Sequence, residues 1–545
     1  MIAEVIPYAR TIRGKDFFDY VVPKNLTVKK GSLVKIEFRS RLIIGLVRDL
    51  KKNSAIKKLK PVIALSTTQL PQPEHFLLFL TWFANHYFIS QAHAFKSMHY
   101  PFLKKRNFAD LDNWQENSSH SQKISIPKKN IESIKNALAK VKPNLPNVVL
   151  YNNRADCLAF YQGIIKRSTG SVLIIVPEYQ DVLKIAEALN NKDIVALTKN
   201  PSPSVWTALE IALQKKSKKI VIGTKKTAFL WLGYFATVIL DQEEARSHKQ
   251  YELNPRYQTR EVILQNINLL TVPKPQLIFC STAPNIETYF AKKSFKINIS
   301  RTWSAKNIFT VNMLEEKMKK NYSWFSEKLM TEIHQSQKTF LFFNRLGNLN
   351  LAVCLNCSAV LPADKTKCPN CQSSHLKQTH QGTQQLEITL KKYFKNKKIV
   401  RLDSTREYQL AELQKADIIL GTEKIFRVMS LADFDLVGII SVDHLLVYPH
   451  FRANERVFQL LTKIFSASQK IIIQTHAPDN MVIKLAILNN YDQFYQQEIK
   501  IRKILNLPPF SPYFQLLDTK NKQKLKPQKY LSEYELKPSL VVDYL

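Results

Sequence analysis

The sequence has 545 residues, more than one hydrophobic core can organise, so we expect three or four domains. Its 80 Lys and Arg against 44 Asp and Glu give a formal net charge of +36, which favours nucleic acid as the partner. Neither a signal peptide nor an apolar stretch of the roughly 20 residues that cross a bilayer is found, so we expect a cytoplasmic protein with no membrane partner.

The first 65 residues alternate apolar and polar positions in short runs, which is typical of strands in a small β-rich domain. The runs are IAEVIPY, FFDYVV, SLVKIEF and LIIGLVRDL. A helix over residues 74–88 is expected to pack on them. Residues 1–60 contain 15 Lys and Arg against 5 Asp and Glu, so this domain is strongly basic. The polar, patternless residues 104–125 indicate a linker.

Apolar strands then alternate with helical segments over residues 126–295, and the pattern resumes over 310–480. Near-continuous apolar runs are typical of strands buried on both faces of a parallel sheet, so the sequence predicts two α/β units in series. The strands expected in the first unit are VVLY (148–151), VLIIVPE (172–178), IVIGT (220–224), TVILD (237–241) and QLIFCST (276–282). Those expected in the second are FLFFN, IVRLD, ADIILGT, LVGIISVD and KIIIQTH.

Four of the six cysteines form a C-x2-C-x10-C-x2-C pattern within the second unit. Thiolates are soft ligands, and four of them close a tetrahedral structural site. The alternative is a redox-active or reduced pair of dithiols, and the nearby His375 and His380 are expected to be surface residues. We therefore expect one structural Zn²⁺, bound by Cys354, Cys357, Cys368 and Cys371.

Stretches along nearly the whole chain resemble, in the same order, the primosomal protein N′ or PriA family of replication-restart helicases. FFDYVVP (17–23) is similar to that family's F-D-Y-x-V-P, and the residues TWFANHYFISQAHAFKSMHYP (81–101) resemble its W-x-A-x-Y-Y helix. FFNRLGN (342–348) is similar to F-x-N-R-R-G-Y, and FRANERVFQLLTKI (451–464) to F-R-A-x-E-R-x-F-Q-L-L. The resemblance implies a multidomain α/β fold with an N-terminal β-rich DNA-binding domain, two RecA-like superfamily 2 helicase lobes and a zinc-binding insert in the second lobe.

The resemblance also implies a division of the chain. Residues 1–105 correspond to the family's 3′-end DNA-binding domain, and a linker over 106–125 stands where the family has a winged helix. Residues 126–295 form a degenerate first lobe, 296–480 a second lobe with the zinc insert at 350–378, and 481–545 a truncated C-terminal domain that is only a short tail after Pro509.

A pocket for the 3′ end of DNA is implied at Phe18 and Asp19, with Lys60 nearby. A carboxylate accepts a hydrogen bond from a terminal 3′-OH, an aromatic ring stacks on the last base, and a lysine meets a phosphate. Arg39 stands where the family has a glycine, and it either crowds the terminal nucleotide or adds a phosphate contact. The alternatives are a core position for Phe18 and a turn position for Asp19.

The motifs that bind nucleotide in this family are degenerate. A P-loop needs two glycines and a Lys-Ser/Thr pair after a strand, but no glycine lies between Val148 and Gln162. GIIKRST (163–169) has the residue types at the wrong spacing, so we expect it to serve packing.

The family's D-E-E-H box, which binds Mg²⁺ and orients the attacking water, is replaced here by Asp241, Gln242, Glu243 and Glu244. We expect a solvated acidic loop, and the alternative is residual Mg²⁺ binding by Asp241. The stretch 462–470 lacks the arginines that reach the γ-phosphate in the family. ATP and Mg²⁺ are therefore not expected as cofactors, and no catalytic residue is assigned.

Three hypotheses follow. The first is a non-catalytic, nucleoid-associated protein that binds forks, D-loops or 3′ ends and supports replication restart or recombination. The second is an active ATP-dependent 3′–5′ helicase with an atypical nucleotide site. The third is a scaffold for replisome or primosome proteins.

Overall fold

The computed structural model describes residues 1–66, 70, 72–98, 128–143, 145–198, 201–291, 295–299, 307–343, 351–357, 360–362, 365–379, 383–403, 408–448, 450–512, 514–518, 523–524 and 540–544. The predicted linker 106–125, residues 344–348 of the FFNRLGN stretch and His380 lie outside these ranges. None of the helices in these ranges is long and apolar enough to span a membrane.

The N-terminal strands form one six-stranded sheet of order β5-β2-β1-β4-β3-β6. All four predicted strands and the predicted helix of this region are confirmed. Alternating positions bury Val5, Ile36 and Val47 in the core of this domain. The elements are β1 (Ile2–Pro7), β2 (Phe18–Val21), β3 (Leu33–Phe38), β4 (Arg41–Lys51), β5 (Lys60–Pro61), β6 (Ala64–Leu65), α1 (Pro73–His86) and α2 (Gln91–Ser97).

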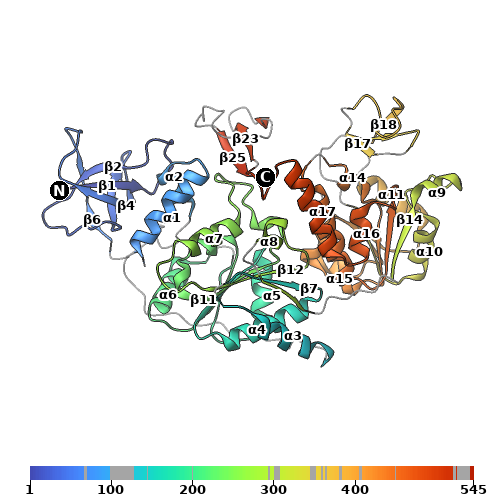
Figure 1. Ribbon diagram of the computed structural model, residues 1–545, viewed down its shortest axis with the longest axis horizontal. Helices are drawn as coiled ribbons and strands as arrows, with labels where there is room; N and C mark the ends of the chain where they lie inside the picture. Colours follow the sequence, from blue (N-terminus) through green and yellow to red (C-terminus); the bar gives the residue numbers. More distant parts are fainter. Residues whose placement is uncertain are drawn as a thin grey trace.

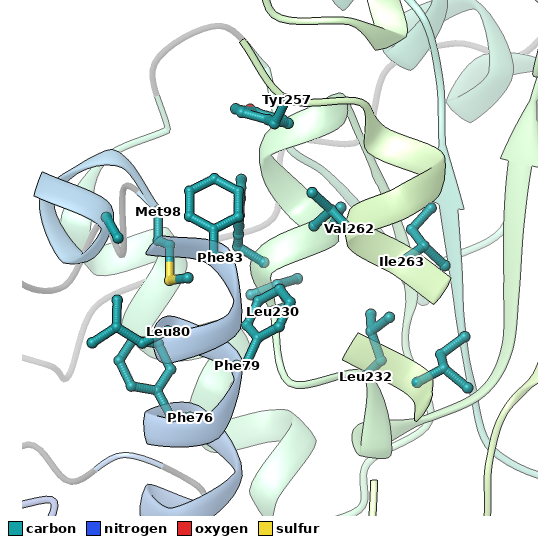
Figure 2. Packing of buried hydrophobic residues seen from close by; sticks show 14 of the residues in the cluster. Phe76, Phe79, Leu80, Phe83, Met98, Leu230, Leu232, Tyr257, Val262 and Ile263 are labelled. Atoms are coloured by element: carbon teal, nitrogen blue, oxygen red, sulfur yellow. The ribbon is translucent and has the colours of Figure 1, made fainter. Parts of the chain in front are cut away.

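Helix α1 attaches the N-terminal domain to the first lobe through aromatic side chains. The rings of Phe79 and Phe83 lie 6.2 and 5.3 Å from the ring of Phe229, and Phe83 lies 5.9 Å from Tyr257. Figure 2 shows α1 laying this row of rings against the first lobe. The side chains belong to one continuous buried cluster, and each buried phenylalanine contributes about 1.5–3 kcal/mol. An isolated N-terminal domain would expose them, so experiments on this domain need the full chain.

The first lobe is a seven-stranded parallel sheet of order β13-β7-β12-β11-β8-β10-β9. Successive residues of β11 face opposite sides: Val238 and Leu240 join the cluster shared with α1, whereas Ile239 joins the cluster that includes α3 and α4. The elements are α3 (Lys128–Lys140), β7 (Asn147–Tyr151), α4 (Arg154–Arg167), β8 (Ser171–Ile175), α5 (Tyr179–Leu189), β9 (Ile194–Ala196), α6 (Pro203–Gln214), β10 (Ile220–Gly223), β11 (Phe235–Asp241), α7 (Thr259–Asn268), β12 (Gln276–Ser281), α8 (Ile286–Tyr289) and β13 (Phe295–Ile299).

The second lobe is a six-stranded parallel sheet of order β14-β22-β21-β15-β20-β19. Residues after position 480 continue it, because Ile483, Phe494 and Tyr495 lie in the main buried cluster of this lobe. The elements are β14 (Ile308–Asn312), α9 (Met313–Met318), α10 (Glu327–Gln335), β15 (Thr339–Phe342), α11 (Thr383–Tyr393), β19 (Ile399–Leu402), α12 (Leu410–Gln414), β20 (Ile418–Gly421), α13 (Ile425–Val428), β21 (Leu436–Ile439), α14 (Asp443–Leu446), α15 (Ala453–Ala467), β22 (Ile471–Thr475), α16 (Met481–Ile487) and α17 (Tyr491–Ile504).

Two small antiparallel sheets complete the fold. The cysteine-rich insert has the order β17-β16-β18, and it projects from the second lobe on the side away from the N-terminal domain (Figure 1). The residues after Pro509 are not the bare tail that we expected, because their strands form a sheet of order β24-β23-β25. The strands are β16 (Leu351–Cys354), β17 (Val360–Pro362), β18 (Leu376–Thr379), β23 (Phe514–Asp518), β24 (Gln523–Lys524) and β25 (Leu540–Tyr544).

Candidate functional site

Three of the four residues predicted for the DNA-end pocket lie on neighbouring strands of the N-terminal sheet, Phe18 and Asp19 on β2 and Lys60 on β5. The Phe18 ring meets the Phe38 ring edge-on at 5.0 Å, and Lys60 Nζ lies 2.6 Å from Glu37 Oε1. Two strands separate β2 from β3 in the sheet order, so the sheet curls to bring these residues together. Phe18 is partly buried against the core of the domain, which agrees with the alternative of a core position, and its stacking on the last base stays a prediction.

The carboxylate of Asp19 is engaged within the protein. Lys51 Nζ lies 2.9 Å from its Oδ1, and Ser54 donates a short hydrogen bond to its Oδ2. Burial raises the pKa of Asp19, but the hydrogen bonds from Ser54 and Lys51 outweigh it, so the net pKa is lowered and the group is ionised. The alternative of a turn position is wrong, because Asp19 lies within a paired strand. A terminal 3′-OH would have to share this carboxylate with Lys51 and Ser54.

Arg39 occupies the tip of the β3–β4 hairpin together with Ser40. Both have positive φ angles, 48° and 60°, the left-handed region that favours glycine. The guanidinium of Arg39 lies 5.3 Å from the centroid of the Phe38 ring, which itself contacts Phe18. Arg39 therefore adds a cation beside the predicted pocket, at the cost of backbone strain.

Replacing Arg39 with glycine is expected to raise the free energy of unfolding by about 1 kcal/mol, because the left-handed conformation costs a side chain of this kind roughly 1–2 kcal/mol. Urea unfolding of the full chain measures the change. Affinity for DNA should fall in parallel if Arg39 contacts a phosphate, and should rise if Arg39 crowds the terminal nucleotide.

The position of a phosphate loop in the first lobe is taken by two residues. The chain passes from β7 to α4 through Asn152 and Asn153 alone, and the Asn153 side chain accepts a hydrogen bond from the Ala155 amide at 2.8 Å. Gly163 lies inside α4, where an added Cβ would stand 2.3 Å from the Leu138 side chain of α3. Gly163, Ile164 and Ile165 of GIIKRST therefore serve packing, whereas Lys166 and Arg167 are exposed.

An ion pair between a fully buried carboxylate and a partly exposed arginine lies at the end of strand β11. Arg154, the first residue of α4, donates to both carboxylate oxygens of Asp241 at 2.5 and 2.7 Å, and the Tyr161 hydroxyl donates to Oδ1 at 2.6 Å. The Asp241 side chain is fully buried. Burial raises the pKa of Asp241, but the charge and hydrogen bonds of Arg154 more than offset this, and the net pKa is lowered. The carboxylate that would meet a metal is therefore neutralised by the protein's own arginine.

The acidic residues after Asp241 also have internal partners. Glu243 accepts hydrogen bonds from the Asn285 amide and side chain and from Thr288, at 2.7 to 2.8 Å. Glu244 accepts from Ser281 and Thr282. Our expectation of a solvated acidic loop is wrong, because Asp241 and Glu243 are only 0% and 3% exposed. The side chains tie the end of β11 to the segment after β12, which a hydrophilic sequence alone does not reveal.

The stretch 462–470 of the second lobe contains no arginine. Stretch 462–470 lies in α15 and just after it, where Lys463 donates to Gln242 at 3.0 Å and Lys470 pairs with Glu332. Neither lysine contacts Asp241 in the part of the chain that the structure describes.

The two lobes are joined by a buried network. Arg452 pairs with Glu287 of the first lobe at 2.5 Å, and Arg502 pairs with Glu455 at 2.7 Å. Glu455 also accepts a hydrogen bond from the backbone amide of Ile286 at 2.9 Å. The hydroxyls of Tyr491 and Tyr495 donate to the carbonyls of Thr282 and Pro284 in the first lobe. These contacts hold the two lobes against each other.

The four predicted metal ligands converge in the insert. The Sγ atoms of Cys354, Cys357, Cys368 and Cys371 lie within 4.8 Å of one another. The closest pairs, Cys354 with Cys371 and Cys357 with Cys368, are 3.4 and 3.6 Å apart. Tetrahedral ligands about 2.3 Å from zinc stand about 3.8 Å apart, so the cluster can hold a metal ion of this size. His375 is exposed, as predicted.

Arg154 and Tyr161, the partners of Asp241, were not among the residues predicted from the sequence. A weak signal was available: residues 154, 157 and 161 recur at the spacing of one helix face, and Cys157 and Tyr161 are both fully buried. An arginine beside a buried helix face needs an acidic partner, and Asp241, at the end of a predicted strand, is a residue of that kind.

The N-terminal domain matches a known DNA-binding family, and most of the chain is similar to known replication restart proteins. Residues 6–99 match the family model of the 3′ DNA-binding domain of PriA. Replication restart protein PriA of Borreliella burgdorferi is 28% identical to this chain. The alignment covers 65% of this chain and 61% of the length of that protein. The PriA protein of Chlamydia pneumoniae is 24% identical over 92% of this chain and 86% of its own length.

Among solved structures, RecG bound to a three-way DNA junction aligns with 69% of this chain and 47% of RecG, at 11% identity and a TM-score of 0.41.

Proposed function

Because the chain belongs to the PriA replication-restart family, we propose that it binds DNA at forks, D-loops or 3′ ends and supports replication restart or recombination without hydrolysing ATP. The DNA-binding part is supported by the match over residues 6–99 and by the excess of basic residues in this region. We further propose that it acts in the cytoplasm on the nucleoid.

The single observation that carries the non-catalytic part is the ion pair between Arg154 and Asp241. Phosphoryl transfer needs glycine-rich backbone around the phosphates, a carboxylate for Mg²⁺ and arginines on the γ-phosphate. Here two residues replace the loop, an arginine side chain neutralises the carboxylate, and stretch 462–470 contains no arginine.

The central test is ATP hydrolysis and strand displacement by the purified full chain, with and without forked DNA. We expect neither activity above background at millimolar ATP, and binding of forked DNA that is insensitive to ATP. DNA-stimulated hydrolysis that Asp241→Ala abolishes would establish the active-helicase alternative instead. Failure to bind forked DNA at physiological salt would favour the scaffold alternative.

End recognition is tested on the same protein with DNA ending in a 3′-OH or a 3′-phosphate. We expect a preference for the hydroxyl, because the ionised Asp19 repels a phosphate dianion. Asp19→Ala should remove most of it, a loss of about 1–3 kcal/mol. Lys60→Ala should weaken both DNAs alike and flatten the salt dependence by about one unit. An unchanged preference in Asp19→Ala would place the DNA end elsewhere.

For the insert we propose one structural Zn²⁺ per chain on the four cysteines. Elemental analysis of the purified protein should give a stoichiometry near one. Cys354→Ser should lower it toward zero and make the insert sensitive to proteolysis, while DNA binding by the N-terminal domain persists. Exposed Ser374→Ala, in the same insert, is the matched control and should retain the metal.

A further inference from the structure

The Asp19 carboxylate, to which the proposed function assigns the 3′-OH, is covered in the structure. Its side chain is only 8% exposed, so a terminal nucleotide reaches it only after part of the cover moves. Both carboxylate oxygens are already engaged, because Lys51 Nζ lies 2.9 Å from Oδ1 and the Ser54 hydroxyl donates a hydrogen bond to Oδ2. One of these two partners therefore has to give way when a DNA end arrives.

Lys51 is the partner that the fold holds in place. Asp19 on β2 lies directly opposite Glu4 on β1, and Lys51 Nζ also lies 3.0 Å from Glu4 Oε1. Without the ammonium, two carboxylates would face each other across a strand pair, which is destabilising. The hydrogen bonds to Asp19 and Glu4 raise the pKa of Lys51, so the ammonium stays charged. We therefore expect Lys51 to remain between the two acids when DNA binds.

Ser54 belongs to a loop of residues 52–59 between β4 and β5, here called the flap, which has few other anchors. Among the described residues, both hydrogen bonds of the flap involve Ser54, whose hydroxyl also accepts from the Ile56 amide at 3.1 Å. The Ile56 side chain is 55% exposed and adds no buried anchor. Three lysines of the flap are exposed as well: Lys52, Lys57 and Lys58. The bond from Ser54 to Asp19 is therefore the main tie between the flap and the sheet.

The Ser54 hydroxyl and a terminal 3′-OH are hydrogen-bond donors of the same kind. Each donates one hydrogen bond, and the ionised carboxylate of Asp19 accepts it from either. Exchange of one hydroxyl for the other leaves the buried oxygen with a partner, whereas release of Ser54 without a ligand does not. A 3′-phosphate dianion has no proton to donate, so it cannot take the place of Ser54.

We propose that the flap is latched over the DNA-end pocket by Ser54 on Asp19 Oδ2, and that a terminal 3′-OH opens the pocket by replacing the Ser54 hydroxyl. The inference rests on the proposed function, because it assumes that Asp19 receives the 3′-OH. It adds a second level of selection at this site, since a hydroxyl end exchanges with Ser54 and a phosphate end leaves the flap closed.

The latch is tested first without DNA, by the rate at which trypsin cuts the full chain within the flap. Cleavage there requires the flap to leave the sheet, so the rate follows the open population. Ser54→Ala should raise the rate about tenfold, the effect of losing one hydrogen bond to a charged group. Asp19→Ala should raise it to a similar extent, and the double variant no further. Mass spectrometry identifies cuts after the three lysines named above.

Two variants of the flap serve as controls for this measurement. Asn53→Ala changes an exposed neighbour of Ser54 and should be cut at the rate of the parent protein. Ser54→Thr retains a hydroxyl and should restore slow cleavage. If Ser54→Ala and Asn53→Ala are cut at the same rate, Ser54 does not latch the flap and the proposal is overturned.

The exchange is tested with a fluorescein-labelled duplex that has a recessed end, either 3′-OH or 3′-phosphate, and the full chain. In the parent protein the 3′-OH has to displace Ser54, so Ser54→Ala should bind the hydroxyl end about tenfold more tightly. Its affinity for the phosphate end should not change, because that end leaves the flap closed. The preference for the hydroxyl should therefore increase in Ser54→Ala and disappear in Asp19→Ala.

The outcomes separate this inference from the proposed function. Faster cleavage of Ser54→Ala with an unchanged affinity for the hydroxyl end would show that the DNA end does not compete with Ser54, which overturns the exchange. If Asp19→Ala loses the preference in the same experiment, end recognition by Asp19 still stands. If Asp19→Ala keeps the preference, both the pocket assignment and the exchange are wrong, whatever the trypsin rates show.

Discussion

Arg154→Met is expected to lower the free energy of unfolding by about 3–5 kcal/mol at pH 7, because it leaves the fully buried carboxylate of Asp241 without a counter-ion. Tyr161 alone would still donate to it. The shift of the urea unfolding midpoint of the full chain measures the loss. Arg167→Met, the same substitution at an exposed position of α4, should change stability by no more than about 0.5 kcal/mol.

The difference in stability between Arg154→Met and the parent protein should depend on pH. In the parent protein the net pKa of Asp241 is lowered, so the pair stabilises the fold above about pH 4, the unfolded value, and the contribution is lost as pH falls through the folded pKa. Without Arg154, burial raises the pKa of Asp241 above the unfolded value, so the folded variant takes up a proton first. The gap between variant and parent should narrow as pH falls from 7 toward about 4.

A double variant separates structure from catalysis. Arg154→Met with Asp241→Leu replaces both charges by apolar groups and should recover most of the stability. If the parent protein uses Asp241 for catalysis, Asp241→Leu should be stably folded but should lack the ATP hydrolysis of the parent. An Arg154→Met variant as stable as the parent would contradict a neutralising role for Arg154.

Glu455→Ala is the second substitution with a large expected effect, again about 3–5 kcal/mol. Glu455 and Arg502 are each 1% exposed, and Arg502 would keep Glu498, at 3.2 Å, and Glu287, at 3.7 Å, as acidic partners. The variant also removes the acceptor of the Ile286 amide, which belongs to the first lobe. The loss should appear as a lower urea midpoint and as new protease cleavage near the junction of the lobes.

Two controls define the origin of that effect. Glu187→Ala, at an exposed position of α5, should be nearly neutral. Glu455→Gln keeps the shape but removes the charge, so an intermediate loss is expected. If Glu455→Ala is as stable as Glu187→Ala, the network does not hold the lobes together.

The sequence by itself predicted the elements that follow local physics. Alternation over residues 1–65 and continuous apolar runs such as VLIIVPE identified the inner strands of all three larger sheets, because burial on one or both faces leaves a regular pattern along the chain. The edge strands β5, β6, β9, β13 and β14 were not predicted. The cysteine spacing likewise predicted a cluster that could hold a metal ion, since two short knuckles bring four thiolates together with little help from the rest of the fold.

The tertiary structure decided what the polar residues do. Asp241 and Arg154 are far apart in sequence, and only the parallel packing of β7, β12 and β11 places the start of α4 beside the end of β11. For the same reason the acidic box, which looks solvated in sequence, is buried among Asn285, Ser281 and Thr288. The hydrophobic pattern of a helix or strand depends on nearby residues and can be seen in its own sequence. The partner of a buried charge depends on which strand ends lie side by side in the sheet, and neither the sequence of α4 nor that of β11 shows this.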